Sequence, residues 1–286
     1  MMRPLSELNP ARLAGVRGVL TDIDDTITTE GRITAQAYSA IELLHDAGYL
    51  VIPVTGRPAG WCDHIARMWP VDAVVGENGA FYMRYDRERR KLTTRHIDHG
   101  ADAHDAREGK HESTDTGPRR DRLHAIGERI LQEVPGSAWA SDQAYRHADI
   151  AIDFCEDVPR LSRVDIGRIV EIMGEEGLTA KVSSIHVNGW FGTYDKLGMT
   201  RTLLAESFGI DLDERREDFI FVGDSPNDAP MFQFFPLSVG VQNVADFVLA
   251  PGQQPKFITS QRSGRGFAEV VQRLTGQVRE CASGSG

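Results

Sequence analysis

Three carboxylates stand within four positions, directly after a short apolar run. Asp22, Asp24 and Asp25 follow the apolar stretch Val19–Leu20. Three acids that are brought together repel one another and lose hydration on burial. A shared cation with oxygen ligands, such as Mg²⁺, best explains a cluster of this kind at the end of a strand. The alternative is a solvated acidic turn, and the other motifs of the chain bear on that choice.

Three further polar motifs lie directly after predicted strands or at the start of a predicted helix. They are Thr55-Gly56-Arg57, Lys196, and Asp224 with Asn227-Asp228. In open α/β sheets, ligands bind just beyond the carboxyl ends of the strands. Motifs from distant parts of the chain can therefore converge on one crevice. Each motif alone fits an ordinary turn or a surface lysine, but four of them in this order favour a site.

The residue types in these motifs match what phosphoryl transfer needs. Asp22 can attack phosphorus, as carboxylates do in enzymes that form an aspartyl-phosphate. Asp24 can protonate the leaving oxygen and later activate water. Thr55 and the Gly56 amide can donate hydrogen bonds to the phosphoryl oxygens, which carry the spread negative charge. These four residues are therefore candidates for the chemistry itself.

A carboxylate that approaches a phosphate dianion needs its negative charge to be offset. Mg²⁺ held by Asp22, Asp224 and an oxygen near Asp24 would do this, because hard oxygen ligands suit that ion. Lys196 supplies a second positive charge, beside the attacked phosphate. We therefore predict a Mg²⁺ cofactor and a catalytic lysine.

Apolar runs and helical patterns alternate on both sides of a long insertion. The run Tyr49–Val54 is almost continuously apolar, which is typical of a strand buried on both faces of a parallel sheet. Strand, helix, strand, helix and strand succeed one another before the insertion, and the same pattern returns after it. This order predicts an α/β fold with a Rossmann-like parallel sheet, formed by residues 1–83 and 190–286.

Residues 84–189 are predicted to be an inserted α+β cap domain. A hairpin is expected at Tyr82–Arg95, and the polar tract Asp98–Arg122 is expected to be a long exposed loop. The histidines of this region match no metal-ligand spacing, so a solvated loop is the better interpretation. Two helices over a small sheet complete the unit. They are expected at Leu123–Val134 and Leu161–Glu176, with strands at Ile150–Phe154 and Ala180–Val187.

Substrate contacts are expected from both domains. Period-two alternation places His186 and Asn188 on one face of the strand before Lys196, together with Ser184. That face either points into the crevice, where His186 and Asn188 would bind substrate, or is simply solvated. Arg57 either binds a phosphate or sugar oxygen or pairs with a nearby acid.

The motifs resemble those of the haloacid dehalogenase-like phosphatase superfamily. The four motifs correspond to Asp22-Ile23-Asp24-Asp25-Thr26, to Thr55 within Val54–Pro58, to Lys196, and to Gly223–Asp228. The match covers about Ala14–Met83 and Trp190–Leu274, and Gly76–Ala80 fits the subgroup that carries a type-two α+β cap and includes sugar-phosphate phosphatases.

The resemblance implies a role for each matched residue. Asp22 is implied to be the nucleophile, and Asp24 the acid/base. Mg²⁺ is implied to bind Asp22, the Asp24 carbonyl and Asp224, while Asp228 orients Lys196 or the metal shell. Apart from the resemblance, the residue types and positions predict substrate binding by Thr55, Gly56, Arg57, Lys196, Asn227, His186 and Asn188.

Composition narrows the range of partners. A net charge of −10 argues against a generic partner among nucleic acids or acidic membranes. The three cysteines are far apart, which favours a reduced, cytoplasmic compartment.

The predicted function is a Mg²⁺-dependent phosphatase of a small phosphorylated metabolite, a sugar phosphate by resemblance. The alternatives are a phosphomutase with the same aspartate nucleophile and a non-enzymatic phospho-aspartate regulator, and no oligomeric state is predicted.

Overall fold

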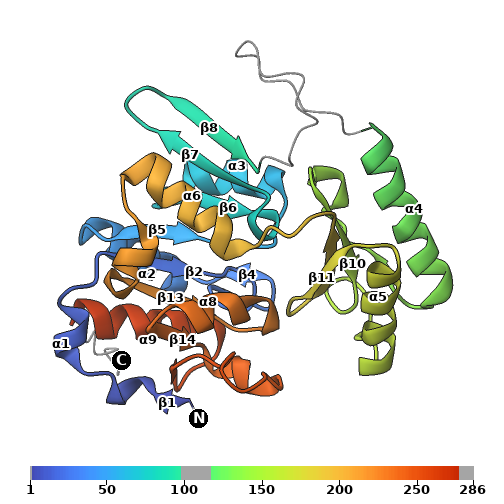
Figure 1. The fold of residues 1–286 in the computed structure, drawn as a ribbon. Helices are drawn as coiled ribbons and strands as arrows, with labels where there is room; N and C mark the ends of the chain where they lie inside the picture. Colours follow the sequence, from blue (N-terminus) through green and yellow to red (C-terminus); the bar gives the residue numbers. More distant parts are fainter. Residues whose placement is uncertain (1, 98–116, 277–286) are drawn as a thin grey trace, which may run out of the picture.

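The computed structural model describes residues 2–97 and 117–276, and a parallel sheet lies at its centre (Figure 1). In this described part the sheet has six strands, in the order β1-β15-β14-β13-β2-β5. All neighbouring pairs run parallel. The strands are β1 (Arg3–Pro4), β15 (Phe257–Ile258), β14 (Leu237–Gly240), β13 (Phe219–Gly223), β2 (Gly18–Thr21) and β5 (Leu50–Pro53). The predicted α/β core with a parallel sheet is confirmed.

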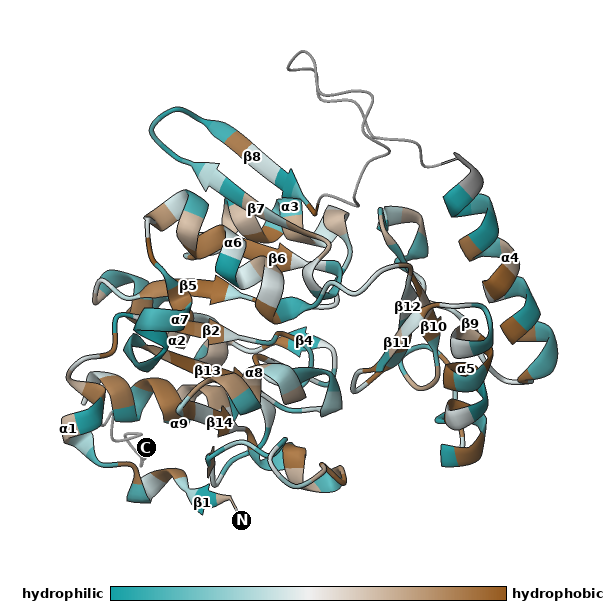
Figure 2. Ribbon diagram, viewed as in Figure 1, coloured by the Kyte–Doolittle hydropathy of each residue, from teal (hydrophilic) through white to brown (hydrophobic). Residues whose placement is uncertain are grey.

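Helices cover both faces of this sheet because successive strand residues point to opposite sides. Val19 of β2 packs with α2 and α9, whereas the next residue, Leu20, packs with α6 and α8. Both residues are fully buried, which explains why the strands read as continuous apolar runs. Figure 2 shows these strands in brown, between helices with teal outer surfaces.

The helices of the core are spread along both of its chain segments. They are α1 (Pro10–Leu13), α2 (Ala35–Asp46), α3 (Ala59–Met68), α6 (Lys196–Phe208), α7 (Leu212–Arg215), α8 (Ala229–Phe234) and α9 (Ser263–Thr275). The predicted N-cap of α2 is present, since Thr34 Oγ1 accepts a hydrogen bond from the Ala37 amide at 3.2 Å. A small hairpin, β3 (Thr28–Thr29) with β4 (Arg32–Ile33), follows the acidic motif.

The predicted hairpin after the second motif is present and pairs with the core. Strands β7 (Phe81–Asp86) and β8 (Lys91–His96) extend β6 (Val74–Gly76) as an antiparallel sheet. A parallel bridge between Val54 and Val75 joins this sheet to the edge of the central one. The predicted boundary between residues 83 and 84 falls inside β7, and the boundary itself stays a prediction.

A separate α+β unit stands beside the carboxyl ends of the central strands (Figure 1). Its antiparallel sheet, within the described residues, has the order β11-β12-β10-β9. Helices α4 (Gly117–Glu133) and α5 (Arg163–Glu175) pack on one face of that sheet around Ile150, Ile152 and Val187. The strands are β9 (Ala138–Trp139), β10 (Asp149–Asp153), β11 (Thr179–Val182) and β12 (His186–Trp190). The predicted α+β cap architecture is therefore present.

Two details of the predicted cap are wrong. The expected strand Ala180–Val187 is two strands, because the chain turns at residues 183–185, where Ser183 Oγ accepts a hydrogen bond from the His186 amide at 3.0 Å. Ser184 therefore lies in a turn and not on the strand of His186. The predicted loop Asp98–Arg122 overlaps α4, which begins at Gly117; the rest of that loop lies outside the described residues.

No helix in the described ranges has the length and hydrophobicity needed to cross a membrane.

Candidate active site

The first carboxylate of the acidic motif lies directly beyond the end of β2. The Asp22 amide donates to the Val222 carbonyl of β13 at 2.9 Å, so that the sheet ladder holds this residue in place. Its side chain is buried, and Oδ1 accepts a hydrogen bond from Lys196 Nζ at 2.7 Å. Lys196 is the first residue of α6 and reaches Asp228 Oδ1 at 2.8 Å with the same ammonium group. Motifs one, three and four thus meet at one point.

A third aspartate, Asp224, completes a cluster that can hold a metal ion. Carboxylate oxygens of Asp22, Asp224 and Asp228 all lie within 4.8 Å of one another, and all three residues are buried. Asp224 Oδ1 has no hydrogen-bond partner among the described residues. Three carboxylates and one lysine leave two uncompensated negative charges. Hard oxygen ligands, an orphaned buried oxygen and a double negative charge fit a divalent cation such as Mg²⁺.

The pKa values of this cluster report the same charge imbalance. Burial, the largest effect, raises the pKa of Asp22 to about 8, although Lys196 opposes it; Asp228 and Asp24 add to the rise. Burial, Asp22 and Asp228 raise the pKa of Asp224 well above its ordinary value. Burial alone would lower the pKa of Lys196, but Asp22 and Asp228 raise it. Without a cation the carboxylates disfavour one another, so cation binding would keep them ionised.

In the loop after β13, the side chain of Asp228 lies close to the backbone of Gly223 and Asp224. Asp228 Oδ2 accepts a hydrogen bond from the Asp224 amide at 3.0 Å. A Cβ atom at Gly223 would lie 2.3 Å from that oxygen, so the close approach requires glycine. Asn227 Oδ1 accepts from Ser225 Oγ at 2.8 Å within the same turn. The Gly-Asp-Ser-Pro-Asn-Asp sequence thus encodes a tight turn that turns Asp228 back toward Lys196.

The second motif lies beside β2, at the end of β5. The Thr55 amide donates to the Val75 carbonyl at 2.9 Å, and Thr55 Oγ1 accepts from the Arg57 amide at 3.0 Å. The Gly56 carbonyl accepts from Arg146 Nη1 of the cap at 2.9 Å. Thr55 is fully buried at the same sheet edge as Asp22. Thr55 thus follows the strand next to that of Asp22, a position that is compatible with phosphate binding.

Arg57 joins the acidic motif to the cap. Its Nε donates to Asp24 Oδ1 at 2.9 Å, and its Nη2 lies 2.8 Å from the same oxygen. The other contacts are to cap residues: Nη1 donates to Asp142 Oδ2 at 3.2 Å, and Nη2 donates to Glu156 Oε1 at 2.7 Å. Trp61 packs against the guanidinium, 4.4 Å from it. The structure thus shows Arg57 paired with acids, the second of its two predicted roles.

The polar face of the cap sheet is directed away from helices α4 and α5. His186 and Asn188 lie opposite Asp153 and Ala151 of β10 and are both buried. Asn188 Nδ2 donates to Asp149 Oδ2 at 3.0 Å, whereas His186 Nε2 lies 2.8 Å from Glu156 Oε2. His186 is therefore one side chain away from Arg57, and Asn188 belongs to a buried network around Asp149. Their contact with substrate stays a prediction.

Sequence reasoning missed two polar residues of this region. Asn243 Nδ2 donates to Asp224 Oδ2 at 3.1 Å and to the Asp25 carbonyl at 3.0 Å. Asn243 follows β14, so the rule that pointed to the other motifs also applies to it. Glu156 follows β10 in the cap, and no local pattern marks it because its partner Arg57 is 99 positions away. Contacts over such separations are visible only in the fold.

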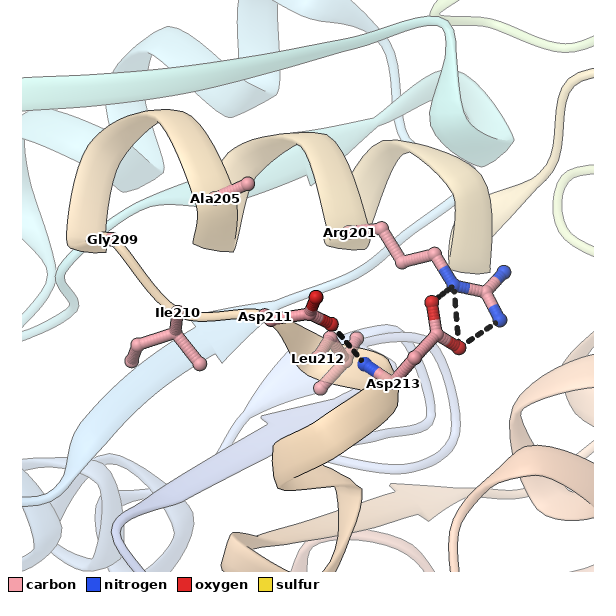
Figure 3. A pocket seen from close by; sticks show the side chains of 7 residues that line it. All are labelled: Arg201, Ala205, Gly209, Ile210, Asp211, Leu212 and Asp213. Carbon is pink, nitrogen blue, oxygen red and sulfur yellow. Dashed lines mark hydrogen bonds and ion pairs between the residues drawn. The ribbon is translucent and has the colours of Figure 1, made fainter.

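A hollow elsewhere on the core contains none of the residues of the four motifs. It has a volume of about 340 Å³ and lies at the far end of α6 from Lys196 (Figure 3). Its cation, Arg201, is held by Asp213 at 2.7 Å. Gly209, Ile210 and Leu212 line the remainder. The reactive groups are therefore gathered at the strand ends beneath the cap.

Comparison with known proteins agrees with this site. The family described as haloacid dehalogenase-like hydrolase matches residues 19–106, which include the first two motifs. A phosphoglycolate phosphatase from Methanospirillum hungatei is 27% identical over 264 residues, covering 90% of this chain and 95% of the relative. The chain is therefore similar to haloacid dehalogenase-like hydrolases, over residues 19–106 by the family comparison.

Solved structures show the same fold over nearly the whole chain. The C-terminal domain of trehalose-6-phosphate phosphatase from C. albicans superposes with a TM-score of 0.66 at 14% identity, covering 97% of this chain and 99% of that one. The sucrose-phosphatase of Synechocystis, solved with sucrose and phosphate, gives a TM-score of 0.57 at 16% identity, covering 91% and 98%. The match therefore extends beyond the core to the cap.

Proposed function

We propose that the protein is a Mg²⁺-dependent phosphatase that hydrolyses a small phosphorylated metabolite, a sugar phosphate, through an aspartyl-phosphate intermediate. The observation that carries the proposal is the contact of Lys196 with both Asp22 and Asp228, next to Asp224. A carboxylate that could act as nucleophile, a lysine and carboxylates that could bind a metal lie together at the carboxyl ends of parallel strands. Relatives that are phosphatases by name support the same reaction class.

Each residue would contribute one part of the reaction. Asp22 attacks phosphorus and forms an acyl phosphate, and Lys196 offsets the charge of the transferred phosphoryl group. Thr55 and the Gly56 amide bind phosphoryl oxygens. Asp24 gives a proton to the departing oxygen and then takes one from the water that hydrolyses the acyl phosphate.

Asp22 and Asp224, with the Asp24 carbonyl, would hold Mg²⁺ when it is bound, and the ion would offset negative charge on the phosphate. Asp228 and Asn243 lie behind these groups. Asp228 holds the ammonium of Lys196, and Asn243 holds one oxygen of Asp224. Their part is to keep the reacting groups in position while the substrate binds and leaves.

Release of free phosphate tests this proposal. The purified protein should release inorganic phosphate from p-nitrophenyl phosphate and from some members of a sugar-phosphate panel. A chelator should abolish the activity, and added Mg²⁺ should restore it, because the buried carboxylates otherwise repel the substrate. Asp22→Asn should be inactive while its circular dichroism spectrum is unchanged.

Two results would contradict the proposal. One is full activity of Asp22→Asn, and the other is full activity of the wild type in excess chelator. Conversion of one sugar phosphate to an isomer without free phosphate would indicate a phosphomutase instead. A phospho-aspartate regulator would form phosphoenzyme once and show no turnover.

A further inference from the structure

Two acidic side chains of the cap contact Arg57, which is the partner of Asp24. Glu156 and Asp142 both contact the guanidinium that holds Asp24, so three carboxylates converge on Arg57. The arginine side chain is 4% exposed, whereas Asp24 is 15% and Glu156 is 23% exposed. The cation is thus covered, and of its acidic partners Asp24 and Glu156 are the ones that solvent reaches. A leaving group next to Asp24 would meet carboxylate oxygens before it could reach the guanidinium.

Glu156 is held as an anion in this position. Burial would raise its pKa, but His186 and Arg57 beside it lower the pKa to about 2. The neighbouring cation Arg146 is buried and is bonded to Asp142 and Asp149, and therefore offers no free charge. Glu156, which is partly exposed, therefore presents a negatively charged hydrogen-bond acceptor on this side of the cap.

Arg160 is an exposed cation near this group and provides a counter-argument. Its guanidinium lies 5.8 Å from the Phe154 ring, and it acts electrostatically on Asp25. It is further along the loop than Glu156 and does not belong to the group of side chains around Arg57. The experiment below therefore includes it.

We propose that Glu156 is a specificity-determining residue: its carboxylate accepts hydrogen bonds from the hydroxyl groups of an uncharged polyhydroxylated leaving group and repels a leaving group that carries a carboxylate. The inference rests on the proposed phosphatase function. An unpaired carboxylate of the substrate would lose hydration beside Glu156 without gaining a partner. The protein then differs in substrate from its relative, which is named for phosphoglycolate, a phosphate ester with a carboxylate.

The test compares glucose 6-phosphate with 2-phosphoglycolate at saturating Mg²⁺. The wild type should have a kcat/KM at least tenfold higher for the sugar phosphate. Glu156→Gln should shift the ratio of the two kcat/KM values at least tenfold toward 2-phosphoglycolate, because the charge is removed and the shape is kept. Glu171→Gln, the same change on the outer surface of α5, should leave the ratio unchanged, since Glu171 is 69% exposed and faces away from Arg57.

Three outcomes overturn the inference. They are a wild-type preference for 2-phosphoglycolate, a ratio that Glu156→Gln does not move, and a selective loss of 2-phosphoglycolate hydrolysis in Arg160→Gln. The ratio of the two kcat/KM values of the wild type requires no variant. A wild-type preference for 2-phosphoglycolate therefore overturns the inference even if Glu156→Gln does not fold. Failure of the proposed function looks different, because no ester, p-nitrophenyl phosphate included, would then release phosphate.

Discussion

Asp24 differs from Asp22, Asp224 and Asp228 in having a guanidinium as its partner. Arg57 contacts both of its oxygens, at 2.9 and 3.1 Å, and so fixes the direction in which the carboxyl group points. A fixed direction matters for a residue that must first give and then take a proton at one place. This geometry distinguishes Asp24 from Asp22, whose oxygen contacts a lysine.

Replacing Asp24 by asparagine should slow turnover by about 10²–10⁴-fold, the usual contribution of a general acid or base. The phosphoenzyme should still form from p-nitrophenyl phosphate, whose leaving group needs no proton, but its hydrolysis should be slow. Rapid-quench trapping of the phosphoenzyme measures both steps. A loss of less than tenfold would contradict the assignment of Asp24.

Asn243 provides a test of metal binding that leaves every predicted ligand in place. Asn243→Ala removes a hydrogen bond to Asp224 Oδ2 at 3.1 Å, and the Mg²⁺ concentration for half-maximal activity should rise about 10–100-fold. Titration of activity with Mg²⁺ measures this shift. Asn9→Ala, which removes an exposed asparagine far along the chain, should not change the Mg²⁺ requirement. An unchanged requirement in Asn243→Ala would show that Asp224 needs no such support.

At the scale of elements, the sequence predicted most of the core because its signals are local. Strands β2, β5 and β13 are short apolar runs, and every motif except Lys196 follows one of them, so these strand ends could be located without the fold. The hairpin β11–β12 was missed because Ser183 and Ser184 continue the pattern of a strand, although Ser183 closes a turn through its own hydroxyl. Glu156 could not be found because its partner comes from another domain.

The 3-10 helix Glu77–Gly79 connects three elements through one carboxylate. Glu77 is fully buried and accepts hydrogen bonds from the amide of Ala59 at the start of α3 at 3.1 Å. It also accepts from the amides of His147 and Ala148, at 2.8 and 2.6 Å, just before β10 of the cap. This side chain therefore helps to hold the cap on the core, beside the contacts of Arg57 and Arg146.

Glu77→Ala should lower the free energy of unfolding by about 2–5 kcal/mol, because three backbone amides lose a buried acceptor. Urea denaturation followed by circular dichroism measures the change. Glu42→Ala, which removes an exposed glutamate from α2, should stay within about 0.5 kcal/mol of the wild type. A loss below about 1 kcal/mol in Glu77→Ala would mean that water replaces the carboxylate without cost.

At the scale of the whole molecule, the contact between core and cap is polar around the site. Arg57, Glu77 and Gly56 of the core meet Asp142, Arg146 and Glu156 of the cap. Most of each apolar cluster lies within one domain, with Ile150 and Val187 in the cap and Val19 and Leu20 in the core, although Trp190 at the end of β12 packs into the core cluster. Polar contacts can be exchanged with water, so the polar part of this contact favours movement of the cap away from the crevice.

The position of β2 between β5 and β13 has a consequence for biosynthesis. β5 is complete at Pro53, but β13 begins only at Phe219, after the entire cap has been synthesised. Until then one edge of β2 stays unpaired on the growing chain, whereas the cap strands β10 and β12 find each other within a short segment. Pairing between near neighbours in sequence is faster than pairing between distant segments. We therefore expect the cap to fold on the ribosome first, and the strand that carries Asp22 to receive its second neighbour only late in translation.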